Sequence, residues 1–303
     1  MSLFGGYENA GVGIDPHAPK KKPFARFWEL LWRNLGKLLL LNLIYVGFHI
    51  PLMLSVIFYL ETNNALTNAM CIFLLAVQAV IAGPTLAGCT RVLRLITLDK
   101  AFFLWEEFKK GFTSNFLMAT LIFVIDAIVA VSVYLGWFMY PQLADLLQSK
   151  AVYLLFAVSL AVALLLLFMN FFLLPMQVAT NLKGGSLFKN ALMLACLSPK
   201  TCLLTFICIA AILALCVLLL LFSSVFMFVF AFFPAAFIGY LVMFINYPVI
   251  QRYVINPYYA ENGETNPEAE VAVSEEERVF TDRGGTETPI HKEKNRHRGK
   301  TIQ

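Results

Sequence analysis

Charged residues are scarce in this sequence, and that scarcity sets its class. Only 14% of the 303 residues are Asp, Glu, Lys or Arg, whereas 59% are hydrophobic, and the mean hydropathy is +0.73. This composition excludes an ordinary soluble domain and indicates a polytopic membrane protein in contact with a lipid bilayer. The net charge of +4 comes from Lys and Arg spread between apolar runs, so no basic face for nucleic acid is expected.

Side chains that carry most enzyme chemistry are also few. Of four histidines, only His49 lies in an apolar run. Glu106 and Glu107 stand before a basic residue, as in some membrane metalloproteases, but no set of His ligands for a metal accompanies them. The six cysteines show no C-x-x-C spacing, and phosphate-binding, dinucleotide-binding and serine-nucleophile motifs are absent from the sequence. We therefore expect no enzyme activity and no cofactor.

Six apolar runs are long enough to cross a bilayer, which takes about 20 residues. They cover residues 38–60, 65–88, 116–140, 151–180, 201–221 and 224–247. The last two form one run that must fold back, and we expect the turn at Ser223 and Ser224. Pro51 and Pro234 are expected to break two spans. The predicted fold is an all-α, six-span membrane domain over 24–255, between a disordered leader at 1–23 and a disordered tail at 256–303.

Lys and Arg gather on one side of the predicted spans. Six precede the first span, five lie between the second and third, and three lie between the fourth and fifth, whereas the opposite loops carry only Lys150. Positively charged loops stay in the cytoplasm, so both termini are expected there.

Amphipathic helices are expected at the membrane surface over residues 24–35 and 101–112, each directly before a span. Their expected interfacial residues are Trp28, Glu29, Arg33, Trp105, Glu106, Lys109 and Lys110. Aligning FWELLWRNL (27–35) with LWEEFKKGF (104–112) pairs Trp28 with Trp105, and LFKNALMLA (187–195) is a weaker third copy.

Each of these three segments precedes an odd-numbered span, and each even-numbered span has a proline toward its inner end: Pro84, Pro175 and Pro248. The pattern predicts three related hairpins around an axis along the membrane normal. The alternative is that any short amphipathic segment before a span looks like this.

One acidic residue, Asp126, stands inside a predicted span, where a carboxylate costs about 2.5–3.5 kcal/mol. His49, Gln78 and Asn170 lie at similar depths in other spans, so these four are the candidate site, an intramembrane polar cluster. The cluster either binds a ligand or protons, or it holds the helices in register through hydrogen bonds.

Several stretches together resemble the YesL-like family, bacterial membrane proteins built on a domain of unknown function. The resemblance spans about residues 24–259 and rests on F-x-R-F (24–27), LLLLNLIYVGFHIP (38–51), AGPTLAG (82–88), FKKGFTSNFLMAT (108–120), LFKNALMLACLSPKT (187–201) and FINYPVIQRYV (244–254). The long acidic-then-basic tail departs from the family pattern.

The resemblance implies a location in the bacterial cytoplasmic membrane and no catalytic residues. Family members are often encoded beside carbohydrate uptake and breakdown genes, which implies a role close to a sugar permease complex. We therefore expect a non-enzymatic accessory or assembly partner of a carbohydrate transport system. The alternative is a small transporter or channel that uses the cluster around Asp126.

Overall fold

The computed structural model describes residues 22–61, 64–182, 184–223, 233–264 and 266–268. In these ranges the chain is helical and has no strand, which confirms the predicted all-α class. The main compact unit runs from Lys22 to Glu264 and contains the predicted membrane domain of 24–255. The predicted leader and tail otherwise lie almost wholly outside the described residues.

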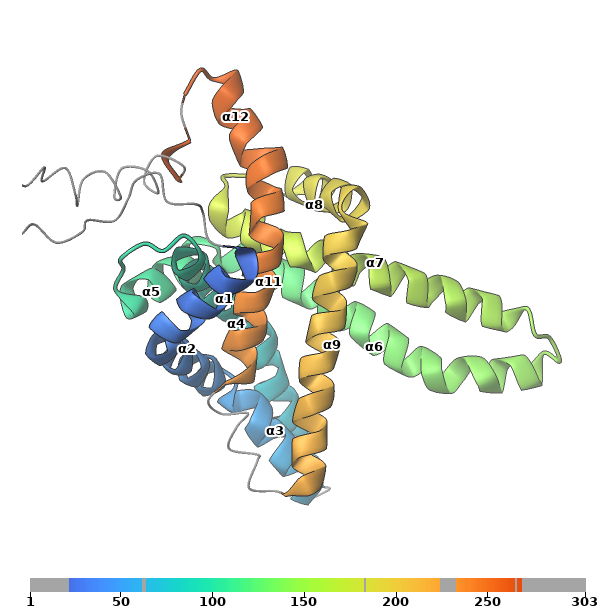
Figure 1. Ribbon diagram of the computed structural model, residues 1–303. Coiled ribbons are helices and arrows are strands. Elements are labelled where there is room, and N and C mark those ends of the chain that lie inside the picture. Colours follow the sequence, from blue (N-terminus) through green and yellow to red (C-terminus); the bar gives the residue numbers. More distant parts are fainter. Residues whose placement is uncertain (1–21, 62–63, 183, 224–232, 265, 269–303) are drawn as a thin grey trace, which may run out of the picture. The chain divides into compact units, whose positions relative to one another are not determined.

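Five stretches of helix are long and apolar enough to cross a membrane, and there are six if a bent pair of helices counts as one span. The five are α4 (Ala65–Thr97), α6 (Phe116–Leu146), α7 (Val152–Ala179), α9 (Pro199–Phe222), and the run of α11 (Pro234–Ile250), η2 (Gln251–Ile255) and α12 (Asn256–Glu261). The chain is therefore a multi-pass membrane protein (Figure 1).

Where the sequence predicts the first span, the chain forms a bent pair of helices, α2 (Leu35–Phe48) and α3 (Ile50–Glu61), which meet at 49°. Pro51 lies just after the bend, as predicted, and it has no N–H to donate to Gly47. His49 N instead donates to Val46 O, one residue closer than in an α-helix, at 2.9 Å. Pro234, where the other break was expected, begins α11. Ser223 of the expected turn ends the helix before it, whereas Ser224 lies outside the described residues.

Three short helices precede the odd-numbered spans, at the places that the sequence indicated, and the first two are strongly amphipathic. They are α1 (Pro23–Arg33), α5 (Leu104–Ser114) and α8 (Gly185–Leu197). A single residue, which we call the linker residue, joins each to its span: Asn34, Asn115 and Ser198.

The three linker residues make the same hydrogen bond. Each side chain donates to the carbonyl oxygen four residues earlier, at 3.1 Å for Asn34, 3.2 Å for Asn115 and 2.6 Å for Ser198. Each linker carbonyl then accepts from the backbone N–H four residues later. The side chain thus satisfies a carbonyl at the end of one helix while the chain turns into the next.

Buried residues occur at the same distances along the sequence from each of the three linker residues. Four residues after it stand Leu38, Ala119 and Cys202, and seven residues after it stand Leu41, Ile122 and Thr205, all at most 2% exposed. Seven residues before it stand Phe27, Phe108 and Ala191. These matches in bonding and burial support the predicted repeat of three hairpins.

The structure shifts the register of the first copy by one helical turn. Counted from the linker residues, Trp28 corresponds to Lys109 and not to Trp105, so the pairing of the two tryptophans was wrong. A shift of four residues keeps an amphipathic pattern almost in phase, because an α-helix has 3.6 residues per turn. The apolar pattern alone could not distinguish the two registers.

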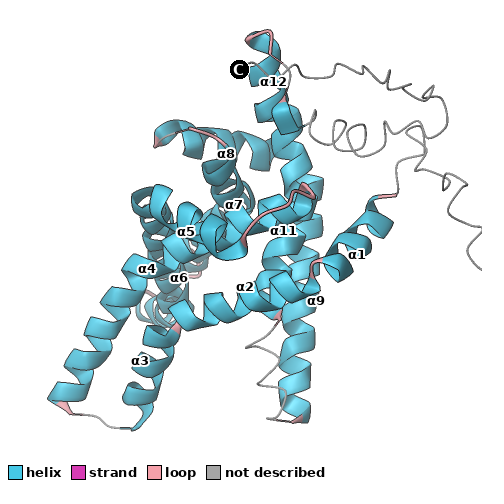
Figure 2. Ribbon diagram, turned by 90° about the vertical axis from the view of Figure 1, so that its left-hand side faces the viewer, coloured by secondary structure: helices cyan, strands magenta, loops and turns pink. Residues whose placement is uncertain are grey.

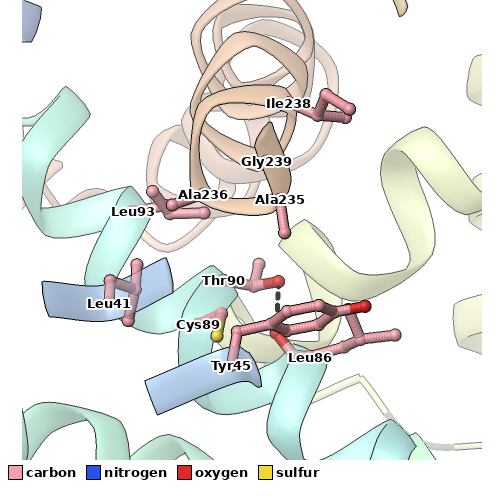
Figure 3. Close-up of a pocket in the computed structure, with 10 residues that line it drawn as sticks. All are labelled: Leu41, Tyr45, Leu86, Cys89, Thr90, Leu93, Ala235, Ala236, Ile238 and Gly239. Carbon is pink, nitrogen blue, oxygen red and sulfur yellow. Dashed lines mark hydrogen bonds between the residues drawn. The ribbon is translucent and has the colours of Figure 1, made fainter. Parts of the chain in front are cut away.

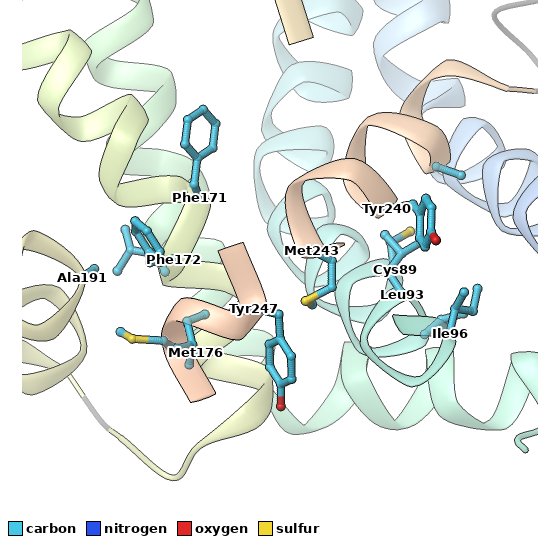
Figure 4. Close-up of a cluster of buried hydrophobic side chains, with 14 of the residues drawn as sticks. Cys89, Leu93, Ile96, Phe171, Phe172, Met176, Ala191, Tyr240, Met243 and Tyr247 are labelled. Atoms are coloured by element: carbon cyan, nitrogen blue, oxygen red, sulfur yellow. The ribbon is translucent and has the colours of Figure 1, made fainter. Parts of the chain in front are cut away.

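The second helices of the three hairpins, α4, α7 and α11, contact one another pairwise, and we call them the inner helices. The outer helices pack on them, α3 on α4, α6 on α7 and α9 on α11. Figures 1 and 2 show the α3–α4 and α6–α7 hairpins diverging from this junction. Buried side chains of the inner helices fill the junction, among them Leu93, Phe172 and Met243 (Figure 4).

Each inner helix also packs against the short first helix of another hairpin. The pairs are α4 with α5, α7 with α8, and α11 with α1. In the last pair the ring of Phe27 lies 4.9 Å from that of Tyr240, whose hydroxyl donates to Phe27 O at 2.9 Å. In the middle pair Ala191 lies beside Phe172 (Figure 4). The three hairpins therefore close into a ring.

Glycines allow the closest contacts of this ring. A Cβ on Gly83 would lie 2.2 Å from Ala119 O, and one on Gly88 would lie 2.8 Å from the ring of Phe108. Lipid tails are as apolar as the side chains, so the hydrophobic effect does not drive helices together inside a membrane. Close packing through small residues stabilises their association instead.

Outward-facing surfaces of the spans are apolar. In the most apolar window of α4, α6, α7 and α9 only 11–17% of residues are buried, compared with 44% for the span that contains α11. We infer that lipid covers the outer halves and that α11 lies deepest in the protein.

Candidate functional site

Two arginines near the C-terminal end of α4 connect the helices that meet at the junction. Arg94 donates from Nε to the hydroxyl of Tyr247 at 2.8 Å and from a terminal nitrogen to Val178 O at 3.3 Å, which joins all three inner helices. Arg91 pairs with Glu107 of α5 at 2.6 Å. These partners explain why α4 continues to Thr97, nine residues beyond the predicted end of its span. The sequence signal was two arginines three residues apart, on one helical face.

The expected interfacial residues lie on exposed faces of α1 and α5. Trp28 and Trp105 are 39% and 58% exposed, and Glu29, Glu106, Lys109 and Lys110 are also exposed. Arg33 forms an ion pair with Asp99, in the turn after α4. Glu107, which was not among the expected residues, makes the ion pair to α4.

The structure brings together two members of the predicted polar cluster. Asn170 of α7 donates from Nδ2 to Asp126 Oδ1 of α6 at 2.6 Å, and also to Leu166 O at 3.1 Å. Asn170 Oδ1 is buried and has no hydrogen-bond partner among the described residues. The pair holds the outer helix and the inner helix of one hairpin at the same depth.

The other two members lie elsewhere. His49 Nδ1 is 2.8 Å from Tyr45 O, and its ring lies against that of Tyr45 at the bend of the first span. Gln78 is 4% exposed in α4, and both of its amide atoms are buried without a partner in the part of the chain that the structure describes. No hydrogen bond among the described residues connects either of them to Asp126. The candidate site therefore reduces to Asp126 and Asn170.

A cavity of about 880 Å³, which we call the central cavity, contains this pair. Its twenty lining residues come from all three inner helices and from α6 and α9. Only Thr90, Asp126 and Asn170 among them have polar side chains, and the Thr90 hydroxyl already donates to Leu86 O at 2.7 Å. The cavity is thus apolar, with one carboxylate and one amide.

A second cavity of about 300 Å³, the side cavity, adjoins it across the contact between α4 and α11. The two share Leu86, Thr90, Ile238 and Gly239. Figure 3 shows Ala235 and Gly239 facing Thr90, with the ring of Tyr45 between α2 and α11. Small residues on α11 therefore open space beside the central cavity that the sequence did not reveal.

Comparison of the chain with protein-family models, with curated proteins and with solved structures finds no match. Within the described ranges, no three His, Cys, Asp or Glu side chains are grouped so that they could hold a metal ion. The chemistry of the site is therefore read from its own residues: a carboxylate–amide pair in an apolar cavity, which can accept a cation or a hydrogen-bond donor.

Proposed function

We propose that this chain is a non-enzymatic accessory or assembly partner of a carbohydrate transport system, as its resemblance to the YesL-like family implies. The observation that supports an accessory role is the lining of the central cavity, where seventeen of twenty side chains are apolar. A bound sugar would leave most of its hydroxyl groups unpaired there, at about 1–3 kcal/mol each. Recognition of the sugar then belongs to the partner permease.

Copurification tests this proposal. The tagged chain would be extracted from its native membrane in mild detergent, and proteins that remain bound through gel filtration would be identified by mass spectrometry. A stoichiometric permease complex is the expected result. If the chain is recovered alone, and permease activity is unchanged when the chain is deleted, the accessory role is wrong.

A location in the bacterial cytoplasmic membrane with both termini inside belongs to the same proposal. It is supported by the Lys and Arg bias and by the short helices α1, α5 and α8, each of which packs against an inner helix. A membrane-impermeant thiol reagent should label Ser149→Cys in intact cells but not Lys22→Cys, in a background where Cys196 is replaced by Ser. The reverse pattern would invert the orientation.

A small transporter is the second candidate, and the Asp126–Asn170 pair in the central cavity favours it. Proteoliposomes that contain only this chain would then take up solute, and Asp126→Asn would slow the uptake. Uptake equal to that of empty liposomes would exclude this alternative for the solutes tested.

A further inference from the structure

We propose that the central cavity binds a small organic cation, a protonated amine carried on an apolar body. This inference concerns the site itself and stands whether or not the chain assists a permease. It rests on three properties of the cavity: its charge, its unpaired hydrogen-bonding groups and its size.

The cavity has a single ionisable side chain among its described lining residues, Asp126, and none of these residues is Lys, Arg or His. Asn170 gives Asp126 a hydrogen bond but no positive charge. Because a lone carboxylate in a membrane interior is costly, a cationic ligand gains the attraction that none of the described lining side chains supplies.

Hydrogen bonding points to the same kind of ligand. The Nδ2 group of Asn170 is already used by Asp126 Oδ1 and Leu166 O, whereas its Oδ1 has no partner among the described residues. Asn170 Oδ1 is buried, so the acceptor left for a ligand in the cavity is the carboxylate of Asp126. A primary ammonium group has three N–H donors and no acceptor, so it can bond to this carboxylate.

The volume favours a small molecule over a helix of a partner protein. Cavities that hold small ligands measure about 300–1,000 Å³, and this one measures about 880 Å³. A membrane-spanning helix about 30 Å long and 10 Å wide would occupy roughly 2,400 Å³. An aminophospholipid also carries a primary amine, but its phosphate would enter a cavity in which the described lining residues include no cation.

Equilibrium dialysis tests the proposal with the full chain in phosphatidylcholine nanodiscs. The probe is 1-naphthylmethylamine, which is protonated at neutral pH, and its uncharged counterpart is 1-naphthylmethanol. Empty nanodiscs correct for partitioning into lipid. We expect saturable binding of the amine at about one per chain, at least tenfold tighter than binding of the alcohol. No saturable amine binding above the lipid background, or equal affinities for the two probes, would overturn the proposal.

Three variants locate the site. Asp126→Asn keeps an oxygen that can accept from Asn170, and we expect it to weaken amine binding at least tenfold without changing that of the alcohol. Asp145→Asn makes the same change at an exposed position of α6 and should bind like the parent. Ala163→Phe should reduce binding of both probes, because it fills a half-buried part of the cavity lining. Amine binding to Asp126→Asn with the parent's affinity would place the site elsewhere.

A change of lipid tests whether the natural ligand is a free amine or the amine of a lipid headgroup. Half of the phosphatidylcholine is replaced by phosphatidylethanolamine, whose headgroup is a primary amine. Unchanged affinity for 1-naphthylmethylamine supports a free amine as the ligand. A tenfold or greater loss of affinity would overturn that assignment and give the site to the lipid headgroup. If Asp126→Asn does not fold, the comparison of amine with alcohol on the parent still decides the role of charge.

Discussion

Gly83→Ala should destabilise the protein strongly, although it adds a single methyl group. That carbon would lie 2.2 Å from Ala119 O and 2.5 Å from its carbonyl carbon, whereas ordinary contact begins at 3.4 Å. The obstacle is backbone, which cannot rotate away, so α4 and α6 must separate by roughly 1 Å. The separation would also lengthen the hydrogen bond from Thr120 Oγ1 to Val80 O, now 3.0 Å.

Two effects should lower the free energy of unfolding of Gly83→Ala. Overpacking of this kind costs about 1–3 kcal/mol, and loss of the interhelical hydrogen bond adds about 1 kcal/mol. The Tm measured by circular dichroism in detergent should then fall by roughly 4–16 °C. Gly36→Ala is the matched control, since nothing lies within 4 Å of its added carbon, and its Tm should stay level or rise slightly. A Gly83→Ala protein as stable as Gly36→Ala would show that α4 and α6 do not pack this closely.

Three further predictions concern the junction, the linker residues and the surface helices. Tyr247→Phe removes the partner of Arg94 Nε and should cost about 1–3 kcal/mol in thermal unfolding, whereas the exposed Tyr258→Phe should cost nothing measurable. Asn115→Ala frees a helix-end carbonyl and should cost about 1 kcal/mol; an unchanged Tm would mean that this hydrogen bond is dispensable. Replacing Lys109 and Lys110 of α5 by Glu should lower the yield of inserted protein, at about 1 kcal/mol of lipid attraction per charge, more than Leu104→Ala does, and equal yields would argue against a membrane-surface position for α5.

The apolar spans and the short helices before them were predictable because hydropathy and helical period are local properties of the sequence. The C-terminal end of α4 could not be predicted. From the sequence alone, Arg91 and Arg94 indicate that the chain leaves the membrane, because the sequence does not show that Glu107 and Tyr247 are their partners. A helix can continue past a charged side chain when another part of the protein supplies a partner for the charge. For Arg91 and Arg94 these partners lie on α5 and α11.

Only half of the polar cluster could be predicted from the sequence, for a related reason. Similar depth in the bilayer can be estimated by counting along each span, and it correctly suggested Asp126 beside Asn170. Depth says nothing about rotation around each helix axis or about which helices are neighbours. His49 and Gln78 share the depth, but one bonds to its own helix and the other is buried in α4.

Closure of the ring by α1 and α11 has a consequence for synthesis of the protein. The ribosome makes Phe27 before any span, but its partner Tyr240 belongs to the last one, more than 200 residues later. Until then Phe27 lacks the aromatic rings of α11 that pack against it, and lipid headgroups can cover this part of the apolar face of α1. Nascent chains that stop before α11 should therefore keep α1 open to proteases, and complete chains should protect it.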